Sequence, residues 1–326
     1  MLGSKRHHRT GTFHAEAHQN SKLEQGITML LLKLYPNILA KGSFQARERI
    51  VKAFEHYFRD NGYCEGSDLV KCRYKHNSEH HIPASDIARF EVGGAFAILA
   101  NTGPTAFWFI YHIYSDAVVL EDCRRELSKV VQEKNGVSEL DLSDLKESCP
   151  VLLSTFQEVL RFHGVGVSTR VALEDHMLNN QYLLKKGSML MIPGGVQHTI
   201  KSVWGPNADE FYHKRFLRSE GGKRPNPVAF RGFGGGSVLC PGRHFATTEI
   251  IAFAALLLMR YDIWPCRGQW SQPKTDNAPM WATVPAPDED IVVSMSLRNH
   301  REWSVSFSGS DKAMEITVED SAVSDK

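Results

Sequence analysis

Cys240 stands in a glycine-rich segment whose composition could support chemistry at the sulfur. It follows the three glycines from Gly234 to Gly236 and precedes Pro241, Gly242 and a long apolar run. Glycines let the backbone approach a flat group closely, because they have no side chain to hold it away. A helix that starts beyond the cysteine directs its N-terminal amides and the positive end of its dipole at the sulfur, which favours a thiolate. The pattern indicates a thiolate held against a planar cofactor.

Three other interpretations of this segment are weaker or less specific. Cys240 could be a small buried side chain in an ordinary loop, which is the usual situation of a free cysteine. A dinucleotide-binding turn would need a third glycine where Ser237 stands, and the preceding Pro225-Asn-Pro227 is no strand. Zinc could bind Cys240 and His244, one helical turn apart, but no second ligand pair follows at the spacing of a zinc finger. Haem-thiolate chemistry is the sharper hypothesis, and it needs support from elsewhere in the chain.

A second candidate is the pair Glu158 and Arg161, which share one face of a predicted helix at a spacing of three. The neighbours of the pair are mostly apolar, so we expect it to be buried, and a buried ion pair needs further partners. Arg215, in the segment Asp209-Glu-Phe-Tyr-His-Lys-Arg-Phe216, is the expected third member. An exposed pair of small energetic worth is the alternative.

The elements that must position these residues are mostly helical. Apolar periodicity with capping and turn signals predicts helices, and runs of β-branched and alternating residues predict strands. The predicted helices are 45–61, 118–134, 144–162 and 247–261, and Pro150 should start a helix or sit in its first turn. The predicted strands are 165–174, 182–192 (two arms joined at 185–187), 290–297 and 303–307. The chain is therefore expected to be mainly α with a small β part.

One further helix should pass through the middle of the core. Ser85 or Asp86 should cap it, and it should run over 88–100 and resume over 105–115. Its residues are apolar on nearly all sides, which predicts a central buried helix. The segment 101–104 should interrupt it, because the proline at its end removes a backbone hydrogen bond and usually kinks a helix.

Composition restricts the class of protein. The 326 residues are 42% hydrophobic and carry a net charge of +1, which suits a sizeable core and argues against a nucleic-acid partner. Six cysteines without a disulfide-scaffold spacing indicate reduced thiols. The polar ends, 1–22 and 309–326, are predicted to be disordered, which leaves 23–308 as the folded part. On the haem-thiolate hypothesis, 23–308 would be the catalytic domain. The apolar run 27–34 is too short to span a bilayer.

These motifs together resemble the cytochrome P450 superfamily. The pair Glu158 and Arg161 is similar to its helix motif, the segment ending near Arg215 looks like the one that completes its ion network, and the Cys240 loop looks like its haem-ligand loop. Three motifs in the family's order are more specific than any one of them. The resemblance covers roughly 82 to the late strands, and 23 onward more loosely, because that is where the matching pattern lies. It implies a cytochrome P450-like fold lacking its N-terminal portion.

The resemblance also implies roles for individual residues. Cys240 would be the axial ligand of the iron of haem b, since a thiolate donates strongly and favours O–O cleavage. Phe233 would pack near the sulfur, while Gly236 and Gly242 would let the porphyrin approach. Arg170 lies where the family often places a strand arginine facing a haem propionate, and an ordinary surface arginine is an equal alternative.

The sequence departs from the family pattern at three places. Val238 stands where many members have an Arg or His that bonds a propionate. Asn101 and Thr102 stand where most members have an acid followed by Thr, as in the branch of steroid 7α-hydroxylases, prostacyclin synthase and their fungal relatives. Proton delivery would then fall to an amide, a hydroxyl and ordered water, unless Asn101 only bonds backbone groups freed by Pro104. The family's anchor, first strands and early helices have no counterpart here, which puts the activity of the chain by itself in doubt.

The resemblance implies a monooxygenase that inserts oxygen into a hydrophobic small molecule, such as a terpenoid, steroid-like or polyketide intermediate of fungal secondary metabolism. NADPH-cytochrome P450 reductase would pass electrons from NADPH. A haem-thiolate isomerase or dehydratase of a peroxide, and a non-catalytic remnant, are the alternatives. The expected location is the cytoplasmic side, with peripheral membrane contact at the endoplasmic reticulum left open through apolar residues of 30–34.

Overall fold

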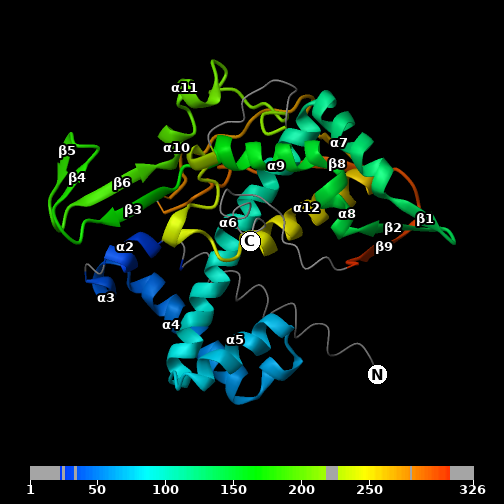
Figure 1. Ribbon diagram of the computed structural model, residues 1–326. Helices are drawn as coiled ribbons and strands as arrows, with labels where there is room; N and C mark the ends of the chain where they lie inside the picture. Colours follow the sequence, from blue (N-terminus) through cyan, green and yellow to red (C-terminus); the bar gives the residue numbers. More distant parts are fainter. Residues whose placement is uncertain (1–22, 24–25, 33–34, 218–226, 280, 309–326) are drawn as a thin grey trace. The chain divides into compact units, whose positions relative to one another are not determined.

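A computed structural model describes residues 23, 26–32, 35–217, 227–279 and 281–308. The tails expected at 1–22 and 309–326 and part of the apolar run, residues 33–34, lie outside the described residues. The chain forms two compact units, Met1–Ala100 with Pro279–Trp281, and Asn101–Ala278 with Ala282–Lys326. Figure 1 shows the elements of each unit in sequence colours.

The first unit is helical. Its elements are α2 (Ile27–Leu32), α3 (Pro36–Leu39), α4 (Lys41–Arg59), a 3-10 turn (Gly62–Glu65), α5 (Asp68–Glu79) and the start of α6 (Ala84–Ser115). Helix α4 confirms the helix predicted over 45–61, although it begins four residues earlier. Helix α5 was missed by the sequence prediction, because none of its side chains is buried and it therefore carries no apolar stripe. The unit's core is Leu23, Ala46, Val51, Ala88 and Val92.

Helix α6 corrects three expectations. It begins at Ala84, so neither Ser85 nor Asp86 is its cap, and it continues through 101–104 without interruption. The hydroxyl of Thr105 donates to the carbonyl oxygen of Asn101 at 2.7 Å, a side-chain bond back to the preceding turn that accompanies the proline. Burial on all sides is also wrong for the first half of the helix, where Ile98 and Leu99 are exposed.

The remaining helices belong to the second unit: α7 (Ala117–Val130), α8 (Leu142–Ser148), α9 (Pro150–His163), α10 (Gly194–Gln197), α11 (Lys201–Trp204) and α12 (Arg243–Arg260). The single helix predicted over 144–162 is split, because Pro150 has no N–H to continue α8 and instead starts α9 at its first position. The helix predicted over 118–134 ends at Val130, where the chain turns into strand β1 (Gln132–Lys134).

Within the described part of the second unit, the strands form four small sheets. The first has the order β1-β2-β9, with β2 (Val137–Asp141) antiparallel to β1 and parallel to β9 (Glu302–Ser306). The others are β3 (Val167–Val171) with β6 (Met189–Pro193), β4 (His176–Leu178) with β5 (Tyr182–Leu184), and β7 (Tyr261–Pro265) with β8 (Val293–Leu297). The two arms predicted over 182–192 are therefore strands, but they pair with β4 and β3 and not with each other.

A large apolar core holds the second unit together. Helices α6, α7, α9 and α12 contribute most of it, including Trp108, Phe109, Phe156, Ile251 and Leu258, all of which are almost fully buried. Each such side chain contributes about 1.5–3 kcal/mol of burial free energy. The indole N–H of Trp108 donates to the carbonyl oxygen of Pro285 at 2.8 Å, so the loop that follows β7 is fastened to α6.

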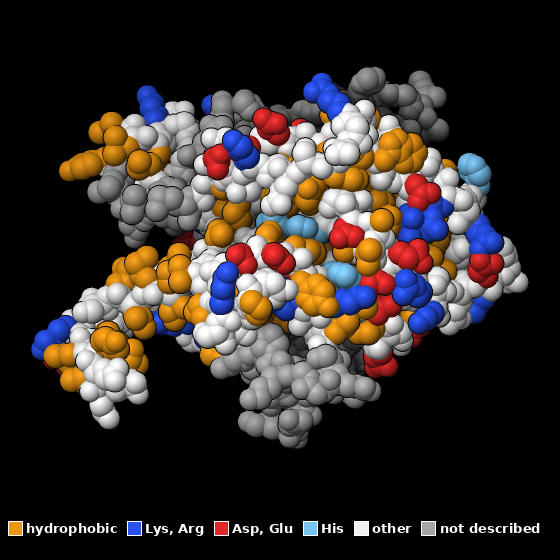
Figure 2. Space-filling model, turned by 90° about the horizontal axis from the view of Figure 1, so that it is seen from above, with side chains coloured by type: hydrophobic (Ala, Val, Ile, Leu, Met, Phe, Trp, Pro, Cys, Tyr) orange, Lys and Arg blue, Asp and Glu red, His pale blue; other side chains and the backbone are white. Residues whose placement is uncertain are grey.

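The β3–β6 ribbon keeps one apolar face in solvent. Val167 and Val171 on β3 and Met189 and Met191 on β6 are each about half exposed or more. Figure 2 shows hydrophobic side chains at the surface among charged ones. Within the described residues, no helix is both long enough and apolar enough to cross a membrane.

Candidate functional site: a glycine-rich cysteine loop on a buried ion network

Glu158 and Arg161 form a buried ion pair on α9. The exposed fractions of their side chains are 0% and 1%, and two parallel bonds of 2.7 Å join the guanidinium to the carboxylate. This two-pronged geometry is the strongest form of an arginine–carboxylate contact. The apolar neighbours seen in the sequence thus do place the pair inside the protein.

Arg215 reaches the same carboxylate from the segment after α11. Its Nε lies 3.0 and 3.1 Å from the two oxygens of Glu158, and the backbone N–H of Tyr212 donates to Glu158 Oε1 at 2.9 Å. One buried carboxylate therefore accepts from two guanidinium groups and one amide. Such a carboxylate is well compensated for its burial, which a lone pair would not be.

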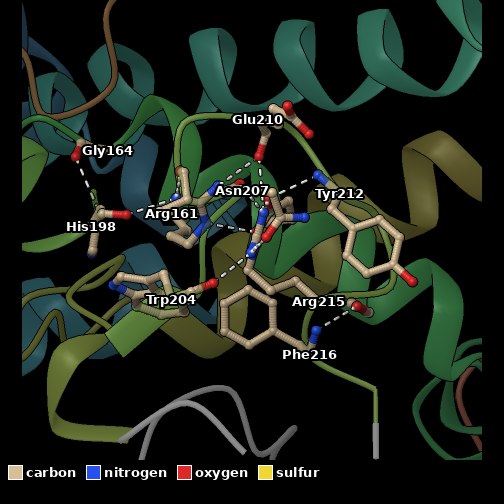
Figure 3. A network of polar contacts seen from close by, with 12 residues as sticks. Arg161, Gly164, His198, Trp204, Asn207, Glu210, Tyr212, Arg215 and Phe216 are labelled. Carbon is tan, nitrogen blue, oxygen red and sulfur yellow. Dashed lines mark hydrogen bonds and ion pairs between the residues drawn. The ribbon is translucent and has the colours of Figure 1, made fainter. Parts of the chain in front are cut away.

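Backbone carbonyls satisfy the remaining guanidinium donors, as Figure 3 shows. Arg161 donates to the carbonyl oxygens of His198, Ala208 and Glu210 at 2.7, 2.7 and 3.1 Å. Arg215 donates to those of Trp204, Asn207 and Glu210, and also to the side-chain amide oxygen of Asn207 at 3.0 Å. Because carbonyls carry no sequence signature, only Glu158, Arg161 and Arg215 could be found from the residues. The network fixes the course of the irregular chain over 198–216.

The Cys240 loop is closed by its own backbone. The N–H of Cys240 donates to the carbonyl oxygen of Phe233 at 2.9 Å, and the six residues between them form a tight loop that contains the 3-10 turn Gly236–Val238. The Phe233 ring packs on the Phe156 ring of α9 with centroids 6.4 Å apart. Helix α12 starts at Arg243, three residues beyond the half-buried cysteine.

Two glycines of the loop are required by its shape. Gly234 has a φ of +78°, a conformation that side chains other than glycine rarely adopt, and a Cβ there would stand 3.0 Å from the carbonyl oxygen of Val238. A Cβ on Gly232 would lie 2.8 Å from the Cβ of Leu160 and 2.6 Å from the ring of Phe230. The loop therefore packs directly against α9, the helix that carries Glu158. The sequence analysis did not single out Gly232.

Gly236 and Gly242 differ from those glycines, because they face open space. A Cβ on Gly242 would meet only the sulfur of Cys240, at 3.9 Å, and a Cβ on Gly236 would meet nothing within 4 Å. Gly236 also has a positive φ of +59°. The backbone on both sides of the half-buried sulfur is thus bare, which leaves room for a flat group beside it.

Arg170 connects strand β3 to this loop. One guanidinium nitrogen donates to the carbonyl oxygen of Gly235 at 3.1 Å, and another donates to that of Thr169 at 2.8 Å. A positive charge therefore lies next to the loop, at Gly235. An arginine fork in this place is suited to a carboxylate.

Asn101 and Thr102 lie on α6 and are both half-buried. The side-chain oxygen of Asn101 is buried and has no hydrogen-bond partner in the structure. A buried acceptor without a donor costs about 1–3 kcal/mol and points to a group or water that binds there. The structure thus places Asn101 and Thr102 on α6 and Cys240 in the separate loop that precedes α12.

Burial keeps two paired histidines of this unit neutral. His112 and His163 share a bond of 2.8 Å between their Nε2 atoms, and their rings stack on Phe211 and Trp108. Burial lowers the pKa of His112 to about 3 and that of His163 to about 2. Loss of hydration disfavours the charged form, so both rings are uncharged at neutral pH.

Comparison with protein-family models matches residues 32–291 to the family described as cytochrome P450. The chain belongs to the cytochrome P450 family. P450 proteins hold haem through a cysteine thiolate. The sequence-based expectation of the family and of a mainly helical P450-like fold is confirmed.

Individual P450 relatives cover most of this chain. It is 35% identical over 289 residues to the cytochrome P450 monooxygenase nodJ of Hypoxylon pulicicidum, which spans 85% of this chain and 56% of that protein. Identity to cytochrome P450 7A1 of Rattus norvegicus is 25%, over 81% of this chain and 56% of the relative. The retinoic acid-bound cyanobacterial CYP120A1 superposes with a TM-score of 0.64 at 20% identity, over 80% of this chain and 58% of that one. The chain spans about half the length of the curated relatives it matches.

The residues of the site fit the cofactor that the family implies. The half-buried thiol of Cys240, the bare backbone at Gly236 and Gly242 and the cation of Arg170 suit a flat, anionic, metal-containing group.

Proposed function

We propose that this chain binds haem b with Cys240 as the axial ligand of the iron and acts as a P450 monooxygenase on a hydrophobic small molecule. Haem held by a thiolate activates dioxygen for insertion into unreactive C–H bonds. The observation that carries the proposal is the loop itself. Its backbone holds Cys240 through the Phe233 carbonyl, and the glycines beside the sulfur face open space.

The chain's own residues would have distinct tasks around that group. Phe233 and Phe156 form an apolar wall that ties the loop to α9. Arg170 would pair with a propionate, replacing the charge that Val238 does not provide. The network of Glu158, Arg161 and Arg215 holds the backbone around the loop and touches no substrate.

Asn101 and Thr102 would act on the opposite, α6 side. The amide of Asn101 can accept a hydrogen bond through its free oxygen and can donate through its nitrogen, while Thr102 can do both through one hydroxyl. Together they would orient a water molecule and pass protons without a carboxylate.

The finer parts of the proposal come from the relatives. Two similar proteins, from Hypoxylon pulicicidum and Penicillium oxalicum, bear the name cytochrome P450 monooxygenase, which supports the monooxygenase reaction. The role in fungal secondary metabolism on a terpenoid, steroid-like or polyketide intermediate is the finer part of the proposal. Electrons would come from NADPH through NADPH-cytochrome P450 reductase. A location at the cytoplasmic surface of the endoplasmic reticulum belongs to the same proposal.

The test is the ferrous carbon monoxide difference spectrum of the purified, haem-loaded chain. We expect a thiolate-type Soret band that is lost in Cys240→Ala and kept in the control Cys266→Ala, which changes an exposed free cysteine. The absence of the band in the wild type, or its persistence in Cys240→Ala, would overturn the assignment. Reductase-dependent oxygenation supports the monooxygenase. Turnover of a lipid hydroperoxide without reductase would instead identify an isomerase.

A further inference from the structure

His198 lies at a junction that no sequence motif marks. It follows α10 directly and its exposed fraction is only 1%. Its carbonyl oxygen accepts from Arg161 at 2.7 Å, so its backbone is part of the guanidinium network, and Figure 3 shows its ring extending from there toward Gly164. The backbone of His198 is thus held by Arg161, a member of the buried ion pair on α9.

Both nitrogens of the His198 ring are bonded to backbone groups. Nδ1 lies 3.2 Å from the carbonyl oxygen of Gly164, and Nε2 lies 2.9 Å from the backbone nitrogen of Arg231. A carbonyl can only accept and a backbone N–H can only donate. The ring must therefore carry its proton on Nδ1 and its lone pair on Nε2, so these two contacts fix the tautomer.

The two partners of the ring belong to two segments that are far apart in the sequence, the end of α9 and the start of the Cys240 loop. Gly164 ends α9, the helix of Glu158 and Arg161, and a Cβ on Gly164 would stand 3.3 Å from Cε1 of His198. Arg231 begins the segment that leads through Phe233, whose carbonyl oxygen accepts from the N–H of Cys240. His198 is the side chain that joins these two segments.

Neighbouring rings restrict the orientation of His198. The Phe230 ring stacks near it at an interplanar angle of 26°, and the Trp204 ring stands edge-on at 88°, both with centroids 6.1 Å away. Phe230 directly precedes Arg231, so ring packing and the hydrogen bond to Nε2 act on the same two residues. Rotation of the imidazole would break both of its bonds inside the core, where water cannot replace them.

We infer that His198 is a positioning residue: it holds the entrance of the Cys240 loop, at Arg231, to the end of α9, and so keeps the thiolate at the iron. The inference rests on the proposed haem-thiolate function. It assigns His198 no contact with haem or substrate. Its effect passes through Arg231, Phe233 and the backbone to the sulfur.

Three substitutions separate the two hydrogen bonds of the ring. His198→Gln keeps an acceptor at about the position of Nε2, whereas His198→Asn keeps a donor at about the position of Nδ1 but cannot reach Arg231. His198→Phe removes both groups and leaves a buried N–H and a buried carbonyl without partners. His213→Phe is the matched control, because His213 is also buried but bonds Asp122 on α7, at 3.0 Å.

The ferrous carbon monoxide spectrum gives the ratio of haem that lacks the thiolate ligand to haem that has it. The thermal midpoint of each variant is measured as well. We expect His198→Asn and His198→Phe to raise this ratio about fivefold, which corresponds to the loss of one net hydrogen bond. We expect the ratio in His198→Gln to stay closer to that of the wild type. We expect His213→Phe to leave the ratio unchanged, even if its thermal midpoint falls. Should His198→Phe not fold, the contrast between Asn and Gln decides the question.

Two negative results have different meanings. If the wild type shows a thiolate band and all His198 variants keep its ratio, the positioning role is overturned while the proposed function stands. If the wild type shows no thiolate band, the proposed function falls and takes this inference with it.

Discussion

Glu158 and Arg215 lie 57 positions apart in the chain, yet the Nε of the arginine is 3.0 Å from the carboxylate. Arg161 binds the same carboxylate through two bonds of 2.7 Å. The three side chains leave almost no surface exposed, at 0%, 1% and 5%. A single carboxylate therefore lies between two buried cations, and we expect the stability of the second unit to depend strongly on it.

Glu158→Gln removes the negative charge and keeps the shape of the side chain. Two guanidinium groups would then be buried against a neutral amide, and we expect the free energy of unfolding to fall by roughly 3 to 5 kcal/mol. Urea unfolding followed by circular dichroism measures this loss. Glu139→Gln is the control, because Glu139 pairs with Lys134 at the surface, where such a pair is worth less than about 1 kcal/mol. Equal losses in the two variants would show that the network is not structural.

Gly232→Ala should damage the contact between the Cys240 loop and α9. The added methyl group would overlap Leu160 and Phe230, and such overpacking costs about 1–3 kcal/mol. We expect a lower thermal midpoint and faster loss of haem, measured by transfer of the haem to apomyoglobin. Gly42→Ala, in α4 with no neighbour within 4 Å of the added Cβ, should instead stabilise by about 0.5–1 kcal/mol. A Gly232→Ala protein as stable as the wild type would contradict the close packing of the loop.

Asn101→Ala tests whether the free amide oxygen serves the reaction or the helix. If Asn101 orients water at the oxygen side, turnover per haem should fall about tenfold or more with an unchanged thermal midpoint. If it only compensates the helix at Pro104, the midpoint should fall and turnover per haem should stay. Thr105→Val is the companion variant, because it removes the hydroxyl bonded to the carbonyl of Asn101 and leaves the side-chain amide intact.

The buried histidines make the folded state sensitive to acid. Burial lowers the pKa of His112, His163 and His198 to about 3, 2 and 4 from an ordinary value of 6.5. Between about pH 6.5 and 4 the unfolded chain binds protons that the folded chain does not, so the stability that is present above pH 6.5 is lost progressively as the pH falls.

Urea unfolding at a series of pH values from 7 to 4.5 measures this loss. His112→Asn replaces one titrating ring with a neutral polar group, so we expect a smaller dependence of the unfolding free energy on pH. A His112→Asn protein with the slope of the wild type would show that this ring is not held neutral by burial.

The sequence could predict features that depend on short spacing. Glu158 and Arg161 are one helical turn apart among apolar residues, so their burial followed from the sequence. Pro150 likewise marked a helix boundary, because a missing N–H is tolerated only in the first turn. The expected interruption at 101–104 was wrong: α6 continues through Pro104, because the packing of its later turns, with Trp108 and Phe109 buried, outweighs the one backbone hydrogen bond that the proline removes.

By itself, the sequence determined the family and the mainly helical fold, and it singled out Cys240 as the ligand that we propose. Only the tertiary structure decided which strands pair, which carbonyls satisfy the arginines, and that His198 joins α9 to the start of the Cys240 loop. The physical reason is that backbone groups are the same at every position. Their partners are chosen by the path of the chain, so a histidine bonded to two of them carries no signature in the sequence.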